Sequence, residues 1–145
     1  MLKTRKTLII LICFGALTLD GVFANYAFKK KVKSVCSAYR VPVDAANMDF
    51  GDELFLLTLD SRRNDFEMVI LVGFASAGQA VSHQQVLKLA NAYLPKTIMV
   101  QVNVPASKGE KIIFEASCPT DMAIALAEGR MESIEFMQQI NLETL

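Results

Sequence analysis

Apolar residues recur along this chain with two different periods, and the changes of period predict where helices and strands lie. Over 26–39 the apolar positions have the spacing of an amphipathic helix, which Pro42 ends. Two apolar runs, 53–59 and 66–74, flank a short polar connector, a pattern that predicts a β-hairpin. The residues over 75–81 are small and are expected to form a loop.

The same order of elements then repeats. Ser82 and Gln85 match a capping box, which predicts a helix over 82–94. Strict alternation over 97–104 and a returning apolar run over 111–117 predict a second hairpin, and a helical region follows to the C-terminus. Short connections favour antiparallel neighbours. The predicted fold is therefore α+β: an N-terminal helix followed by ββα-ββα, with helices on one face of an antiparallel four-stranded sheet.

The N-terminal segment, with basic residues before and after an apolar run, has two interpretations. The first is a signal peptide over 1–24, with cleavage between Ala24 and Asn25 and an exported, periplasmic or secreted product. The second is an uncleaved anchor over 8–28, which as a helix of about 31 Å could cross a hydrocarbon core of about 30 Å. Asp20 opposes the anchor, because a mid-membrane carboxylate costs about 2.5–3.5 kcal/mol.

Residues 25–145 are long enough to bury a core, so they are predicted to form one small domain. The whole chain carries 15 basic and 15 acidic residues, a balance that argues against a nucleic-acid partner. The only basic cluster consists of Lys29, Lys30, Lys31 and Lys33. These lysines form either a solvated helix face or a contact with anionic lipid head groups.

Cys36 and Cys118 are the cysteines that follow the N-terminal segment. In an oxidising compartment they could form one disulfide, closing a loop of about 83 residues and contributing roughly 4–5 kcal/mol. The alternative is two separate buried thiols.

Signatures of catalysis and cofactor binding are weak. The glycine spacing over 73–80 resembles a phosphate-binding loop, but Gln79 and Ala80 stand where that chemistry needs Lys and Ser or Thr. His83 is the only histidine and could pair with a thiol, but a surface role is expected. One histidine and two distant cysteines do not form a metal site. No cofactor is therefore predicted.

The C-terminal region is rich in soft apolar side chains: Met122, Met131, Phe136 and Met137. Such residues either pack adaptably in a core or form a surface for a partner protein.

Three functions follow from these features. The first is an exported, non-enzymatic cell-envelope protein that acts as a protein-binding, inhibitor or accessory module, with another envelope protein as its partner. The second is a membrane-anchored subunit of an envelope complex. The third is a small thiol-dependent or hydrolytic enzyme that uses Cys36, Cys118 or His83.

Overall fold

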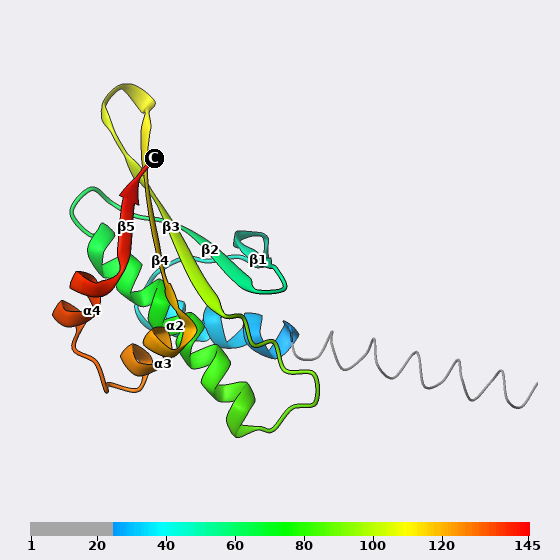
Figure 1. The fold of residues 1–145 in the computed structure, drawn as a ribbon. Helices are drawn as coiled ribbons and strands as arrows, with labels where there is room; N and C mark the ends of the chain where they lie inside the picture. The colour runs from blue at the N-terminus through cyan, green and yellow to red at the C-terminus, as the bar shows by residue number, and fades with distance from the viewer. Residues whose placement is uncertain (1–24) are drawn as a thin grey trace, which may run out of the picture.

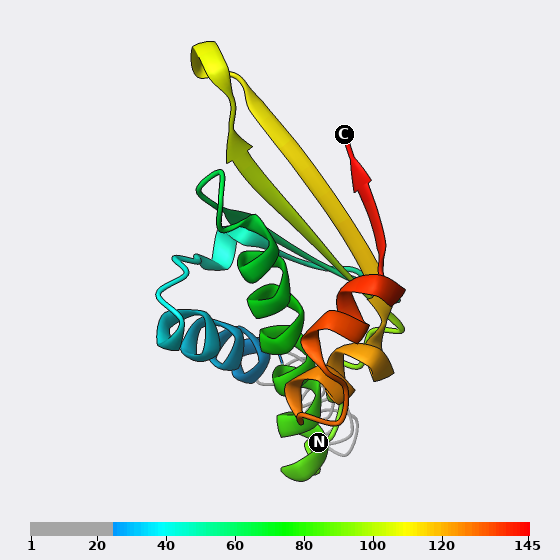
Figure 2. The ribbon, with the colours of Figure 1, turned by 90° about the vertical axis from the view of Figure 1, so that its left-hand side faces the viewer.

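The computed structural model describes residues 25–145, which form a five-stranded mixed sheet with the helices packed on one side (Figures 1 and 2). The strands are β1 (Met48–Phe50), β2 (Leu54–Asp60), β3 (Thr97–Pro105), β4 (Lys111–Pro119) and β5 (Asn141–Thr144). The helices are an N-terminal helix over 25–38, α2 (Phe66–Val86), α3 (Thr120–Ala127) and α4 (Ser133–Gln139). Two 3₁₀ turns, η1 (Ala45–Asn47) and η2 (Ser107–Gly109), complete the list.

The strands lie side by side in the order in which they occur in the chain. β2 and β3 are parallel and are joined through α2, whereas the other neighbouring pairs are antiparallel. The predicted α+β class, with helices on one face, is confirmed. The predicted four-stranded antiparallel sheet and the ββα-ββα order differ from the structure, because α2 replaces a predicted strand and β1 and β5 add two others.

The run over 66–74 was predicted as a strand, and this prediction is wrong because the run begins the 21-residue helix α2. The buried residues of α2 cover most of its circumference, since the helix packs between the sheet, the N-terminal helix and α3 (Figure 2). The stripe that stays partly exposed is itself largely apolar, with Met68, Leu71, Ala75 and Val86. A helix that is apolar on every side has no polar stripe, so its sequence cannot show the helical period.

The small residues over 75–81 were predicted as a loop, but they belong to the middle of α2. They allow a close crossing of helices. A Cβ atom at Gly78 would overlap the carbonyl oxygen of Ala123 in α3. Glycine is therefore required at residue 78 by the approach of a neighbouring backbone and not by a turn.

The prediction of a helix over 82–94 is also wrong, because α2 ends at Val86 and the chain continues without regular secondary structure to Pro95. This segment is fixed by Gln84, which is fully buried. Its Nε2 donates to the carbonyl oxygen of Tyr93, and the Tyr93 N–H donates back to Oε1, both at 2.9 Å. The hydroxyl of Tyr93 donates to the carbonyl oxygen of Gly51 at 2.8 Å.

The N-terminal helix over 25–38 agrees with the sequence prediction, and Phe28 joins it to the sheet. The Phe28 ring lies 5.5 Å from Phe50, 4.7 Å from Phe55 and 5.3 Å from Tyr93, in edge-on arrangements that aromatic pairs favour. Four segments that are distant in sequence therefore meet in one aromatic cluster.

The signal peptide predicted over 1–24, Ala24 of its cleavage site and residues 8–24 of the alternative anchor lie outside the described residues. The last residues of that anchor, 25–28, belong to the N-terminal helix, and Phe28 is fully buried in the domain. Within 25–145, none of the helices combines the length and the apolar character needed to cross a bilayer.

Candidate functional site

One face of the sheet is free of helices over the described chain, and its side chains are ordered by the strand register (Figure 2). Alternate residues of β3, from Ile98 to Val104, are buried against the helices, whereas the residues between them are half-buried on the opposite, open face. One row of register partners crosses all five strands on this open face. The row consists of Asp49, Leu56, Met99, Ser117 and Asn141.

A second row on the open face is polar and crosses four strands. It consists of Thr58, Gln101, Glu115 and Glu143. The Gln101 side-chain amide donates to Glu115. The directly opposed Glu143 carboxylate accepts a long hydrogen bond from Asn141, at 3.4 Å, and has no ion-pair partner in the described residues. Like charges that face each other across two strands are destabilising. The opposition of Glu143 to Glu115 therefore costs the isolated domain some stability.

The strand residues of the open face have a strong charge asymmetry. Their carboxylates are Asp49, Asp60, Glu115 and Glu143, and their single basic residue is Lys111, near the tip of the β3–β4 hairpin. Asn103 donates to Asp60 at 3.1 Å, which orients this carboxylate without neutralising it. A face with this charge favours basic groups on whatever binds it.

The β3–β4 hairpin extends beyond the helical layer, and the N-terminal helix lies toward the opposite end of the molecule (Figures 1 and 2). β5 pairs with β4 on one side only, so its other edge is unpaired within the sheet. The open face is therefore bordered by a projecting hairpin and a short edge strand.

The four lysines that follow the N-terminal segment do not form one cluster, because they line different pockets or contact different side chains. Lys30 and Lys31 line a surface pocket of about 390 Å³ together with Tyr26, Ser34 and His83. Lys33 lines a different pocket, and the Nζ of Lys29 lies 5.3 Å from the centre of the Phe50 ring as a cation–π contact. Only two of the four lysines therefore share a site.

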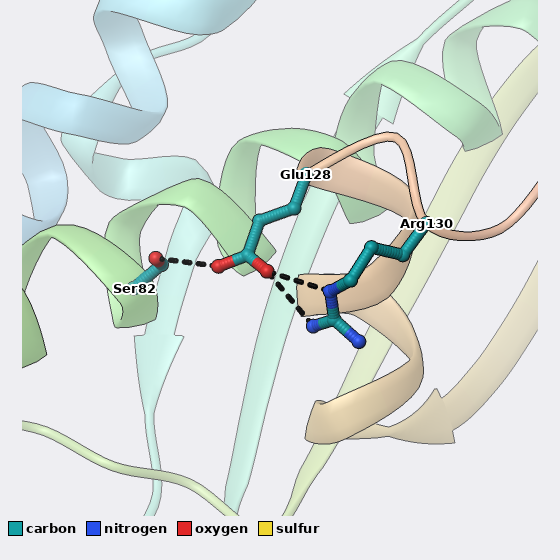
Figure 3. A network of polar contacts seen from close by, with 3 residues as sticks. All are labelled: Ser82, Glu128 and Arg130. Carbon is teal, nitrogen blue, oxygen red and sulfur yellow. Dashed lines mark hydrogen bonds and ion pairs between the residues drawn. The ribbon is translucent and has the colours of Figure 1, made fainter.

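A polar network lies beside this pocket (Figure 3). Ser82 donates to Glu128 at 3.1 Å, and Arg130 forms an ion pair with the other oxygen of Glu128 at 2.8 Å. The bonds from Arg130 and Ser82 lower the pKa of the Glu128 carboxyl below its ordinary value. Ser82, predicted to cap a helix, instead connects the last turns of α2 to the end of α3.

Cys36 and Cys118 are both buried and free, so the disulfide that the sequence allowed is not present in this structure. Burial raises the pKa of Cys36, although a hydrogen bond with Ser76 partly opposes it. Burial also raises the pKa of Cys118, to about 12, against a weaker opposing contact with the backbone of Ala123. A thiol with a raised pKa holds little of the reactive thiolate at neutral pH.

The residues predicted as weak candidates for chemistry do not converge. The run over 73–80 lies inside α2, so it cannot form a phosphate-binding loop. His83 lines surface pockets, whereas the polar neighbours of the two buried thiols are Ser76 and the Ala123 backbone. Over residues 25–145, no group of three or more His, Cys, Asp or Glu side chains is arranged to hold a metal ion.

The methionine-rich set at the C-terminus packs largely inward. Phe136 is fully buried and lies 5.1 Å from the ring of Phe74, so it cannot belong to a partner surface. Met122, Met131 and Met137 are half-buried against the same core. Their contacts are those of adaptable core packing.

Comparisons of the chain with models of protein families, with curated proteins and with solved structures give no match. Functional inference therefore depends on the open face, the basic pocket and the N-terminal segment.

Proposed function

We propose that this protein is a non-enzymatic accessory module of the cell envelope, which binds another envelope protein through the open face of its sheet. The observation that carries the proposal is the excess of carboxylates on that face, with Glu143 directly opposite Glu115. The opposed carboxylates cost the isolated domain stability, and a bound partner with basic side chains would neutralise them.

The composition of the open face also suits protein recognition. Leu56 and Met99 form an apolar centre on adjacent strands, and Asp49, Asp60 and Glu143 surround it as an exposed acidic rim. Protein interfaces commonly have an apolar centre and a polar rim. The favoured partner surface is therefore one with an apolar patch surrounded by Lys or Arg.

The envelope location is inferred from the sequence of residues 1–24. A membrane-anchored subunit is the second candidate, and it is favoured by the two lysines that share a pocket close behind the apolar segment. Intact-mass measurement of the protein from its native membrane fraction separates these candidates. A mass that begins at Asn25 supports the exported, cleaved form, and a mass that retains the N-terminus supports the anchor.

Site-specific photo-crosslinking in the native cells tests the binding face. A crosslinking residue at Met99 should capture a partner, whereas the same residue at Gln85, exposed at the end of α2, should not. Charge reversal by Asp60→Lys with Glu143→Lys should abolish the Met99 crosslink, and Glu67→Lys with Glu110→Lys is the matched control. Equal crosslinking from Met99 and Gln85, or equal loss in both double variants, would contradict the proposal.

A further inference from the structure

The pocket lined by Tyr26, Lys30, Lys31, Ser34 and His83 has one chemical character. Each of these side chains offers at least one N–H or O–H donor, and two carry a positive charge. Among the described residues, no carboxylate lines the cavity. The nearest acidic group of the adjoining pocket, Glu128, is already bonded to Ser82 and Arg130. The pocket therefore favours an anion that accepts several hydrogen bonds.

The size of the pocket narrows the class of anion. Its volume of about 390 Å³ lies within the range of about 300–1,000 Å³ that is typical of small-molecule sites. A bare phosphate would fill little of it, whereas a phosphate with its glycerol backbone and polar substituent would occupy it more fully. The donors are charged lysines, which bind phosphate as point charges.

The pocket residues lie close in sequence to the apolar N-terminal segment, which indicates that the phosphate belongs to a membrane lipid. Tyr26, Lys30 and Lys31 come within seven residues of the apolar N-terminal segment, about 10 Å along a helix with a rise of about 1.5 Å per residue. The head-group layer beyond each side of a bilayer core is roughly 5–8 Å thick. Insertion of the apolar segment would therefore bring the pocket close to the head-group layer, and exposed Tyr26 is of the residue type that favours this interface.

We propose that this pocket binds the head group of an anionic phospholipid, with Lys30 and Lys31 holding the phosphate and His83 beside it. Lys29 and Lys33 belong to other surroundings and are not part of the site. The proposal rests on the second candidate function, in which the apolar segment is retained and enters the membrane, and it is independent of the partner proposed for the open face.

Because His83 is the only histidine, its imidazole signals are unique in the NMR spectrum of the full chain. The protein in non-ionic detergent micelles is titrated separately with phosphatidylglycerol, phosphatidylcholine and inorganic phosphate. Phosphatidylglycerol should shift the His83 signals to saturation, and the zwitterionic lipid should not. Inorganic phosphate should require at least about a hundredfold higher concentration. A His83 signal that does not respond to phosphatidylglycerol overturns the proposal, and equal binding of inorganic phosphate assigns the pocket to a free anion and also overturns it.

Two double variants distinguish binding in this pocket from general electrostatic attraction of the protein to anionic lipid. Lys30→Gln with Lys31→Gln should weaken phosphatidylglycerol binding by about 30-fold, the effect expected for two lysines at an anionic surface. Lys33→Gln with Lys108→Gln removes the same charge from outside the pocket and should weaken binding by less than about threefold. Equal weakening in the two double variants overturns the assignment to this pocket. Unchanged spectra of the remaining residues show that each variant is folded.

Discussion

The two faces of the sheet are built from alternate residues of the same strands, yet they differ in almost every physical property. On the face under the helices, Ile98, Val100 and Val102 are fully buried. On the open face, Gln101 and Asn103 hydrogen-bond to carboxylates of neighbouring strands. The comparison shows that the buried apolar contacts that stabilise the fold lie on one side of the sheet. The other side is therefore available to bind a partner. Substitutions on the two sides should consequently differ in effect by several kcal/mol.

Phe28→Ala should have the largest effect, because it removes the ring that joins the N-terminal helix to the sheet. Loss of a fully buried phenylalanine costs about 3–5 kcal/mol. Urea unfolding measures the change. Tyr26→Ala on the same helix removes a ring that is 62% exposed and should change the free energy of unfolding by less than about 0.5 kcal/mol. Similar losses in the two variants would contradict the position of the N-terminal helix.

Gly78→Ala should follow, with a loss of about 2–3 kcal/mol and a Tm lower by about 10 °C. The added methyl group meets the backbone of Ala123, which can move only if α3 moves. Gly73→Ala is the matched control in the same helix. Its Cβ would lie 2.9 Å from a methyl group of Val100, and small side-chain shifts relieve that contact. Equal Tm values for the two variants would contradict the close crossing of α2 and α3.

Gln84→Leu should cost about 2 kcal/mol, since it leaves the Tyr93 N–H and carbonyl without their buried partner. The neighbouring Gln85 is exposed, and Gln85→Leu should change stability by less than about 0.5 kcal/mol. Hydrogen exchange gives a second measurement, because the amide of Tyr93 should lose its protection only in the Gln84 variant. Retained protection would show that another group anchors the segment over 87–95.

Glu143→Gln should have the smallest effect and the opposite sign. Removing one of two like charges that face each other across β4 and β5 should stabilise the domain by about 0.2–0.5 kcal/mol, and added salt should reduce the gain. Glu110→Gln, at the exposed turn of the hairpin, is the control and should be neutral. Thermal melting at low and high salt detects the difference. A destabilised Glu143→Gln variant would show that this carboxylate supports the fold, contrary to its proposed role in binding.

The sequence predicted the elements whose two sides differ. The helix over 25–38 and the strand β3 were found because apolar and polar positions alternate with a clear period. The strand β4 was found as the apolar run that returns after a turn. α2 was missed because its partly exposed stripe is largely apolar, like its buried sides, and so gives no polar stripe. β1 and β5 were missed because three or four residues, several of them polar, carry no measurable period.

The candidate sites were predictable only in part, for a related reason. The lysine cluster is visible in the sequence because its members are adjacent, but His83 joins Lys30 and Lys31 only through the packing of α2 on the N-terminal helix. The acidic rows of the open face depend on strand order and register. Asp49 and Glu143 are 94 positions apart in the chain, on the two edge strands, and share one face only through the intervening strands.

The sequential order of the strands has a consequence for how the molecule forms. Each strand pairs with the strand before it, so no late segment must be inserted between two that are already joined. A chain that emerges from its N-terminus, during synthesis or after passage through a membrane pore, can extend the sheet by one strand at a time. Only the β2–β3 pairing must wait, until α2 has folded back across the growing sheet. The open face is therefore complete only when β5, the last of the five strands to emerge, places Glu143 opposite Glu115.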